Sequence, residues 1–368
     1  MSTTNNRSLI DALHLRETFE VVKRKVVPQH KSSVWYYMGG LCILFFIVQI
    51  VTGVLLLFYY QPTVEAAHKS ITRIVNEVPF GWLIRSLHSW SANALVLTAF
   101  IHMFSAMLMK AYRAPRRILW VTGMILLALM LGFGFTGYLL PWDETAYFAT
   151  KIGTEVPKAV PFVGDIISAL IKGAADVNGA TLTRSFALHV GVLPVLSILF
   201  VLLHVGLMLL FGSSSPVGTE VKGETRYFPD YLIKEMMVWL IGFGILVAIA
   251  VIYPWGLGKA YDIANPSEPP AGVHPEWYFM FLFQTLKLLP EWLVVIGFVL
   301  VAVFWTTIPW LDKKADREQR SPLFTWIGIV AIVYMTAMTA WAYVSVSQER
   351  VEAPVGVHAT TTDSAHAK

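Results

Sequence analysis

Long uncharged, apolar segments alternate with shorter polar ones along most of the chain. The uncharged segments cover residues 34–60, 86–109, 118–142, 185–219, 236–258, 292–311 and 321–348. Each reaches or exceeds the roughly 20 helical residues that cross a hydrocarbon layer of about 30 Å. Because an isolated span in lipid must satisfy its backbone hydrogen bonds internally, the pattern predicts seven transmembrane helices and an all-α membrane fold.

The composition agrees with a membrane environment. Of 368 residues, 56% are hydrophobic and only 14% are charged, against about 25% charged in soluble domains. With an odd number of spans the two termini lie on opposite sides. If the N-terminus is inside, 17 of the 28 Lys and Arg residues lie on the inner side. This bias predicts a cytoplasmic N-terminus, and it explains the formal charge of +4 without affinity for nucleic acid.

The two ends of the chain are more polar than the rest. Residues 1–33 are too polar for a secretory signal, and "LHLRETFEVVKRKVV" within them could lie as an amphipathic helix on the inner membrane surface. The tail 348–368 is expected to be disordered. Between them we expect a four-helix bundle over residues 34–215 and a three-helix part over 216–347.

Four histidines stand in two of the predicted spans. His88 and His102 are 14 residues apart, about 40° on one helix face and about 21 Å along the axis. His189 and His204 are 15 residues apart, about 60° and about 22 Å. One such histidine could be a hydrogen-bonded packing residue. Four at matching depths predict bis-histidine ligation of two haem irons, His88 with His189 near the outer side and His102 with His204 near the inner side.

Paired glycines in the other two spans of the bundle support this prediction. Gly39 and Gly53 are 14 residues apart, and so are Gly123 and Gly137. Glycine lets a helix backbone approach a macrocycle closely, although small residues also serve ordinary helix packing. The one cysteine, Cys42, excludes an intramolecular disulfide and a CxxCH haem attachment site, and it is expected to be a buried structural thiol.

Several motifs together resemble cytochrome b, the membrane subunit of cytochrome bc-type quinol oxidoreductases. They are "GWLIRSLH" at 81–88, the four histidines, the paired glycines, "GYLLPWDE" at 137–144 and "PEWY" at 275–278. The resemblance runs from about residue 20 to 345. It implies two non-covalent b haems and a quinol site on the outer side.

The seven-span length and the 15-residue histidine gap resemble the photosynthetic branch of that family, with its haem subunit and three-helix subunit joined in one chain. That branch attaches an extra haem through a cysteine. The equivalent position here is about Tyr37, and Cys42 does not match it, so a covalent extra haem is not expected. Trp142 stands where the branch has arginine. The chain therefore resembles a form intermediate between the respiratory and photosynthetic branches, and we expect it in a bacterial inner membrane.

The loop over residues 255–291 contains "PEWYFMF". A carboxylate beside Pro275 and Trp277 at the membrane edge should be poorly solvated and have a raised pKa, which suits a proton acceptor. The resemblance assigns quinol deprotonation to Glu276 and substrate positioning to Tyr278. Tyr138 and Phe148 would form the opposing wall. Without the resemblance, such a loop is more typical of an interfacial aromatic anchor.

Charged residues near the expected haems have proposed roles as well. Arg85 is expected to pair with a haem propionate. Of Lys110, Arg113 and Arg116, one residue, Arg113, is assigned to the inner haem and the others to the positively charged flank. By resemblance, Lys234 and Glu235 match a Lys-Asp pair at the inner quinone site. A histidine that helps there in respiratory members has no counterpart, since Leu209, Leu210 and Phe211 occupy that stretch.

The resemblance implies that one electron from quinol passes to an iron-sulfur protein and then to a c-type cytochrome or a cupredoxin. The other crosses both haems to quinone on the inner side, which builds a proton gradient. A homodimeric complex is also implied. Two alternatives stay open: a dihaem subunit of a dehydrogenase or hydrogenase, which needs no "PEWY" loop, and a proton-coupled transporter, which should carry intramembrane acids.

Overall fold

The computed structural model describes residue 23 and residues 25–352, and its architecture is almost entirely helical. The long helices are α3 (Tyr37–Leu57), α5 (Gly81–Leu108), α6 (Arg117–Leu139), α10 (Leu193–Phe211), α11 (Leu232–Ile252), α13 (Glu291–Leu311) and α15 (Pro322–Glu352). Together with the short helices and turns that continue some of them, these give, among the described residues, seven helices long and apolar enough to cross a membrane. The predicted all-α fold with seven spans is confirmed.

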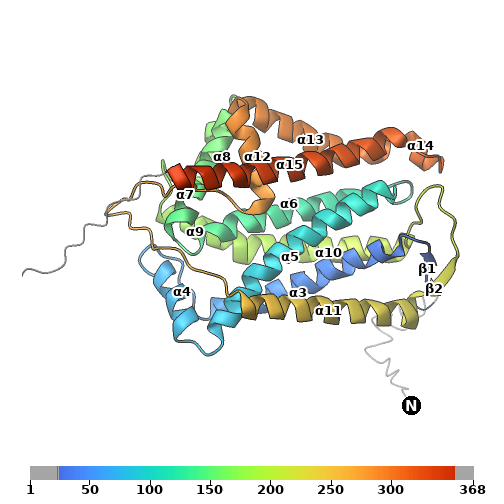
Figure 1. The fold of residues 1–368 in the computed structure, drawn as a ribbon, viewed down its shortest axis with the longest axis horizontal. Helices are drawn as coiled ribbons and strands as arrows, with labels where there is room; N and C mark the ends of the chain where they lie inside the picture. Colours follow the sequence, from blue (N-terminus) through green and yellow to red (C-terminus); the bar gives the residue numbers. More distant parts are fainter. Residues whose placement is uncertain (1–22, 24, 353–368) are drawn as a thin grey trace, which may run out of the picture.

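Four of these helices form a bundle (Figure 1). Helix α3 packs along α5, and α6 packs along α10. Apolar side chains that include Leu44, Phe45, Leu95 and Leu246 are buried where α3, α5 and α11 meet. The three C-terminal spans do not pack as one unit. Helix α11 lies against α3 and α5, whereas α13 contacts α6, and α15 contacts α5 on the other side of the bundle.

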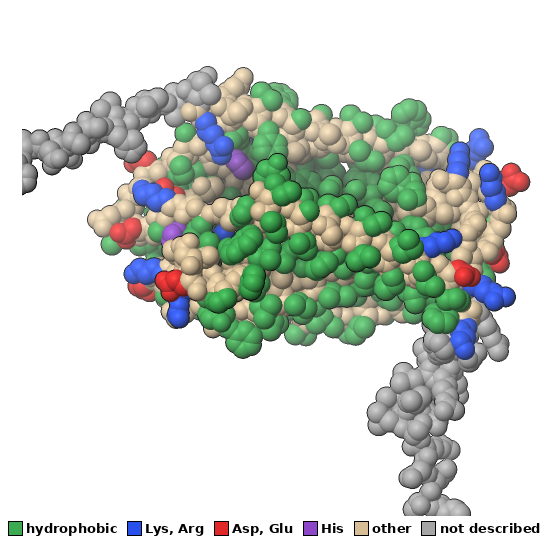
Figure 2. Space-filling model, turned by 60° about the horizontal axis from the view of Figure 1, so that its bottom comes forward, with side chains coloured by type: hydrophobic (Ala, Val, Ile, Leu, Met, Phe, Trp, Pro, Cys, Tyr) green, Lys and Arg blue, Asp and Glu red, His purple; other side chains and the backbone are tan. Residues whose placement is uncertain are grey.

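The surface divides into an apolar belt and two charged ends. Figure 2 shows hydrophobic side chains over the middle of the visible face, with lysine, arginine and acidic side chains gathered at the two ends. Many large apolar residues on α10, α11, α13 and α15 are exposed, among them Leu202, Leu240 and Val303. This distribution is the one expected for a protein whose solvent is a bilayer.

Shorter helices cover one end of the bundle, which we call the His88 end. They are α4 (Ala67–Asn76), α7 (Glu144–Glu155), α8 (Gly164–Lys172), α9 (Gly179–Ala187) and α12 (Trp277–Leu288). A 3₁₀ turn, η2 (Val156–Ala159), joins α7 to α8. The opposite end, the His102 end, carries a small antiparallel pair of strands and the short helix α14 (Lys313–Asp316).

The two-stranded sheet corrects the end of the predicted amphipathic helix. Strand β1 (Val26–Gln29) pairs with β2 (Gly223–Arg226), with Val26 opposite Arg226. Two successive β-branched valines followed by Pro28 favour extended backbone, because proline cannot continue a helix. Most of the rest of the predicted amphipathic segment lies outside the described residues.

Helix α15 corrects the start of the expected disordered tail. The helix continues to Glu352, five residues past the predicted boundary. Two contacts hold this last part: Glu349 pairs with Lys287 at 2.6 Å, and Arg350 donates to the Gly272 carbonyl at 3.4 Å. The predicted tail beyond residue 352 lies outside the described residues.

Candidate functional site

Two pairs of histidines face each other between α5 and the helix that contains α10. The ring centres of His88 and His189 are 6.3 Å apart, and those of His102 and His204 are 6.4 Å apart. Two imidazoles bound to one metal at about 2 Å each would have ring centres about 6 Å apart. The two pairs therefore have the spacing of two axial ligand sets, one near each end of the bundle.

Threonine hydroxyls set the orientation of three of the four rings. Nδ1 of His88 lies 2.9 Å from Thr52 Oγ1, Nδ1 of His204 lies 2.9 Å from Thr122 Oγ1, and Nδ1 of His189 lies 3.2 Å from Thr136 Oγ1. Each hydroxyl also donates to a backbone carbonyl of its own helix. The hydroxyl oxygen must therefore accept from Nδ1–H, which leaves Nε2 of each ring free to bind a metal.

Each of the four glycines lies against one of these imidazoles. A Cβ atom would stand 3.2 Å from Cε1 of His102 at Gly39, 3.3 Å from Cε1 of His88 at Gly53, and 3.2 Å from Cε1 of His204 at Gly123. At Gly137 it would stand 2.6 Å from Cε1 of His189. A side chain at Gly137 would force the His189 imidazole to move, and one at Gly39, Gly53 or Gly123 would make an unusually tight contact with its imidazole.

A π-helical turn, η3 (Leu188–Val192), contains His189 and joins α9 to α10. Such a turn closes hydrogen bonds one residue further along than an α-helix does, so it takes up one extra residue. Pro194 follows in the first turn of α10 and cannot donate a backbone hydrogen bond. The 15-residue gap from His189 to His204 is thereby matched to the 14-residue gap from His88 to His102.

A second candidate site is a cavity of about 170 Å³ at the His88 end. It lies between α6, α7, α12 and the segment that leads into α12. Its lining is mostly apolar and consists of Gly134, Phe135, Tyr138, Ala149, Thr150, Ile152, Gly153, Val156, His274, Pro275, Glu276, Phe279, Leu282, Phe283 and Leu286. An apolar cavity with a few polar groups suits an organic ligand with a polar ring edge.

Glu276 is the acidic group of this cavity. It directly precedes α12, and burial raises the pKa of its carboxyl above the usual range. Tyr138 also lines the cavity and donates from its hydroxyl to the His274 carbonyl at 3.2 Å. Tyr278 is buried against α6, where a Cβ at Gly134 would stand 2.3 Å from its hydroxyl oxygen. Burial, followed by the nearby Glu276, raises the pKa of Tyr278.

The structure brings some of the predicted cavity residues together and places others elsewhere. Pro275, Glu276 and Tyr138 line the cavity. Trp277 instead donates from Nε1 to Asn93 Oδ1 on α5 at 2.8 Å. Phe148 packs against Tyr261, with ring centres 5.5 Å apart, rather than lining the cavity.

Sequence reasoning missed His274 and the three threonines that hold the imidazoles. A signal for the threonines was present, because each directly precedes one of the glycines as a Thr-Gly pair at 52–53, 122–123 and 136–137. His274 directly precedes the "PEWY" motif and lines the cavity.

The start of α7, which forms one wall of the cavity, is fixed by its cap. Asp143 accepts a hydrogen bond from the Ala146 N–H at 2.8 Å, and it pairs with Ala260 as an isolated antiparallel bridge. Trp142, at the position where the sequence departs from the arginine of the photosynthetic branch, is fully buried beside Tyr147.

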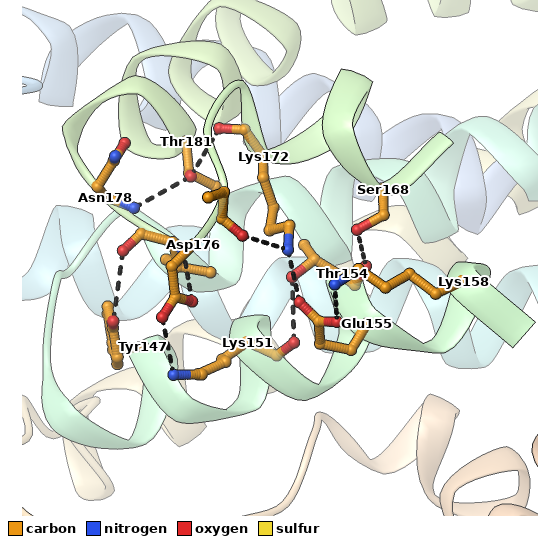
Figure 3. A network of polar contacts seen from close by, with 12 residues as sticks. Tyr147, Lys151, Thr154, Glu155, Lys158, Ser168, Lys172, Asp176, Asn178 and Thr181 are labelled. Carbon is orange, nitrogen blue, oxygen red and sulfur yellow. Dashed lines mark hydrogen bonds and ion pairs between the residues drawn. The ribbon is translucent and has the colours of Figure 1, made fainter. Parts of the chain in front are cut away.

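The C-terminal half of α7 is held by a polar network with α8 and the segment that follows it (Figure 3). Lys172 is only 2% exposed, and its ammonium contacts Glu155 Oε1 at 2.5 Å and the Ala175 carbonyl at 2.9 Å. Lys151 pairs with Asp176 at 2.9 Å. Loss of Glu155 would leave the buried Lys172 ammonium without its counter-charge, so this contact helps to keep the wall in place.

Three cationic side chains near the ends of α5 are buried. Arg85 donates to the carbonyls of Trp255 at 2.6 Å and Gly256 at 2.7 Å. Arg113 donates to the carbonyls of Lys110 at 3.2 Å and Ser215 at 3.1 Å. Lys110 Nζ is buried and has no hydrogen-bond partner among the described residues. A buried ammonium without an acceptor fits the carboxylate of a haem propionate at the His102 end.

The predicted inner quinone residues lie at the His102 end of α11. The Glu235 carboxyl fits against Gly40 of α3, where a Cβ would stand 2.0 Å from Oε1. Lys234 lines a small cavity together with Tyr37 and Tyr231, whose rings stack with centres 5.0 Å apart. Tyr37 is the position where the resemblance places the attachment cysteine of the extra haem.

Comparison with protein families gives two matches that together cover most of the chain. Residues 22–212 match the family described as Cytochrome b/b6/petB, and residues 263–361 match the family described as Cytochrome b(C-terminal)/b6/petD. The first range contains all four histidines, and the second contains Glu276. Helix α11 lies between the two ranges.

Individual relatives agree with the family matches. The chain is 46% identical over 342 residues to a "Cytochrome bc complex cytochrome b subunit" of Chlorobaculum thiosulfatiphilum. This alignment covers 90% of this chain and 79% of the relative. It is 42% identical over 207 residues to "Cytochrome b6" of Gloeobacter violaceus. This alignment covers 56% of this chain and 96% of the relative. A solved structure, "Hyperthermophilic respiratory Complex III", has the same fold, with a TM-score of 0.73, 23% identity, and coverage of 93% of this chain and 100% of that one.

Proposed function

The chain belongs to the cytochrome b family, and we propose that it is the membrane subunit that oxidises quinol and conducts electrons across the bilayer in a cytochrome bc complex. The observation that carries the proposal is the placement of the Glu276 cavity at the same end of the bundle as His88 and His189. A quinol in the cavity is then next to the first of two electron carriers that lie on a line across the membrane.

Two b haems are the expected cofactors, and they supply reversible one-electron transfer when bound. His88 and His189 would hold one, and His102 and His204 the other. The fit rests on ring spacings of 6.3 and 6.4 Å and on Thr52, which orients His88 so that Nε2 is the free nitrogen. Because both imidazoles of a pair would bind a haem, the bound haem would have no ligand site open for oxygen and would supply electron transfer only.

In the cavity, the residues of this chain bind quinol and accept a proton from it. The buried carboxylate of Glu276 takes the proton of a quinol hydroxyl, because its raised pKa lies nearer to the operating pH than that of an exposed glutamate. Tyr138 on α6 lines the cavity and contacts the ring, whereas Tyr278 on α12 is not part of the lining and, buried against Gly134, supports the α6 wall. The apolar lining excludes water and favours the neutral quinol over charged solutes.

One electron passes from the site to an iron-sulfur protein. From there it passes to a c-type cytochrome or to a cupredoxin. The other electron crosses the bundle to quinone on the opposite side. The chain contains one cysteine, and the described residues contain no group of three or more His, Cys, Asp or Glu side chains that could hold a metal. Partner subunits must therefore supply the iron-sulfur centre and the c-type haem.

The orientation follows from the charge distribution of the sequence. The His102 end faces the cytoplasm, the His88 end faces the periplasm, and the membrane is a bacterial inner membrane. Lys234 and Glu235 serve quinone reduction at the cytoplasmic end, and protons released at one end and taken up at the other build a gradient. Membership of the cytochrome b family supports a homodimeric complex.

Spectroscopy on the purified complex with its partner subunits tests the proposed function. Dithionite should reduce two b haems per chain. Addition of quinol together with an oxidised high-potential acceptor should reduce b haem further than quinol alone, because removal of one electron makes the second available. A colourless chain, or haems that quinol cannot reduce under either condition, would contradict the proposal and favour the alternatives.

The close contact of Gly137 with His189 gives a further test. In Gly137→Ala, the new Cβ would stand 2.6 Å from the imidazole, so the ring must move and the haem at the His88 end should be partly or wholly lost. Haem content per chain should fall from two toward one. Gly191→Ala is the matched control, because a Cβ at Gly191, in the same π-turn as His189, meets nothing within 4 Å. Equal haem content in both variants would rule out a ligand-positioning role for Gly137.

A further inference from the structure

The side chain of Trp277 ties the start of α12 to α5, the helix that carries the first histidine of each pair. Its Nε1 donates to Oδ1 of Asn93 at 2.8 Å. Nδ2 of Asn93 donates to the Ser89 carbonyl at 2.9 Å, and because a carbonyl can only accept, this bond fixes which side of the amide faces the indole. The Trp277 ring also packs edge to face on Phe100, with ring centres 6.5 Å apart. The indole is therefore held on α5 by a directed hydrogen bond and by an aromatic contact.

The residues on either side of Trp277 depend on this anchor. Glu276 precedes it and lines the cavity, whereas Tyr278 follows it and is buried against Gly134 of α6. Successive residues of a helix point about 100° apart, so Trp277 and Tyr278 contact two different helices of the bundle. These two contacts prevent the first turn of α12 from rotating about its axis. They thereby set the position of Glu276, which directly precedes that turn.

Proton transfer depends steeply on the position of the acceptor. A base must lie within about 2.6–3.2 Å of the atom that gives up the proton, and a misplacement of about 1 Å can lower a rate by about 10²-fold. Asn93 and Trp277 are not among the described residues that line the cavity, so their route to the substrate runs through Glu276. Asn93 stands on the same helix as His88. Helix α5 therefore positions both a haem ligand and, through the indole, the proton acceptor.

We propose that Asn93 is a positioning residue for quinol oxidation, an inference that rests on the proposed function. Through the Trp277 indole it holds the Glu276 carboxylate at the place in the cavity where the carboxylate accepts the quinol proton. Asn93 itself does not contact the quinol. Its hydrogen bond keeps the proton acceptor and His88 at a fixed separation, so that one bound quinol can serve both.

Steady-state kinetics of the full complex test this role. Asn93→Leu nearly keeps the size of the side chain but offers the indole no acceptor, and Trp277→Phe keeps an aromatic ring but has no N–H. Each should lower kcat for quinol oxidation by about tenfold, because the displaced carboxylate reaches the reactive geometry less often. The KM should stay within about twofold of the wild-type value, since the cavity lining is unchanged. Both haem spectra should match those of the wild type.

Two double variants show through which groups Asn93 acts. Asn93→Leu combined with Trp277→Phe should be no slower than either single variant, because both changes break the same hydrogen bond. Asn93→Leu added to Glu276→Gln should cause no further loss, because glutamine accepts no proton and its exact position no longer matters. A residue that only supported the fold would slow the wild type and the Glu276→Gln variant equally.

Thr98→Val is the matched control. Thr98 lies on α5 five residues after Asn93, and its hydroxyl bonds the Ala94 carbonyl at 2.8 Å and Cys42 of α3 at 3.5 Å. The change removes a polar group from the same helix, and the rate should equal that of the wild type. A wild-type rate in Asn93→Leu, loss of a haem in that variant, or a further loss of similar size in the Glu276→Gln background would each overturn the role of Asn93. Failure of the wild-type complex to oxidise quinol would instead overturn the proposed function.

Discussion

The variant His102→Leu is expected to carry one b haem per chain instead of two. Leucine offers no ligand atom, so only His204 would remain to hold a haem in a pair whose ring centres lie 6.4 Å apart in the wild type. The pair formed by His88 and His189 should be unaffected, because His88 stands 14 residues away on α5, about 21 Å along the axis. Quinone reduction at the cytoplasmic end should stop, since its electron path is interrupted.

Haem content per chain and a redox titration check this result. The titration should lose one of two midpoint potentials, and the remaining haem should still be reduced when quinol and an oxidised acceptor are added together. His68→Leu, at a histidine that faces neither pair, should keep both haems. Loss of the haem at the His88 end alone would show that the assignment of the pairs to the two ends is inverted.

The variant Glu276→Gln is expected to slow quinol oxidation by about 10²-fold while both haem spectra stay intact. Glutamine has nearly the same shape as glutamate and keeps the cavity lining, but it cannot accept a proton. The comparison of kcat with KM separates the two possible defects: loss of the acceptor lowers kcat, whereas loss of substrate contact raises KM. Glu268→Gln, at an exposed carboxylate in the same loop, should behave as the wild type.

The raised pKa of Glu276 gives this prediction a pH dependence. Glutamate accepts a proton only in its ionised form, which predominates above the pKa. Because burial raises that pKa, the rate should fall on acidification at a higher pH than an exposed glutamate would cause. This acidic limb should be missing in Glu276→Gln. An identical rate and pH profile in the variant would remove Glu276 from the mechanism.

Much of the candidate site could be predicted because its residues are expensive in lipid. An imidazole in an apolar span indicates a functional site by itself. Helical periodicity is enough to place His88 and His102 on one face of the same helix. The same reasoning could not place Phe148 and Trp277, which point toward Tyr261 and Asn93 and not into the cavity. Their directions depend on how α5, α7 and the long loop pack, and no local pattern records that packing.

His274 was overlooked for a related reason. A lone histidine in a polar loop has no periodicity and no partner within the motif that follows it. Only the fold brings the loop against α6 and α15, where Tyr138 bonds its backbone and Tyr343 faces its ring.

By itself, the sequence determined the seven spans, the all-α architecture and the four histidines at two depths, because hydrophobic length and the 3.6-residue repeat act locally along each helix. Matching depths already predicted the two histidine pairs, but the tertiary structure decided the distance between the paired rings and their orientation, since both depend on helix packing between distant segments. It also revealed the π-turn at Leu188–Val192, which takes up the extra residue between His189 and His204. A position calculated from residue spacing holds only for a uniform α-helix, and a single π-helical turn is enough to change which side chains face each other.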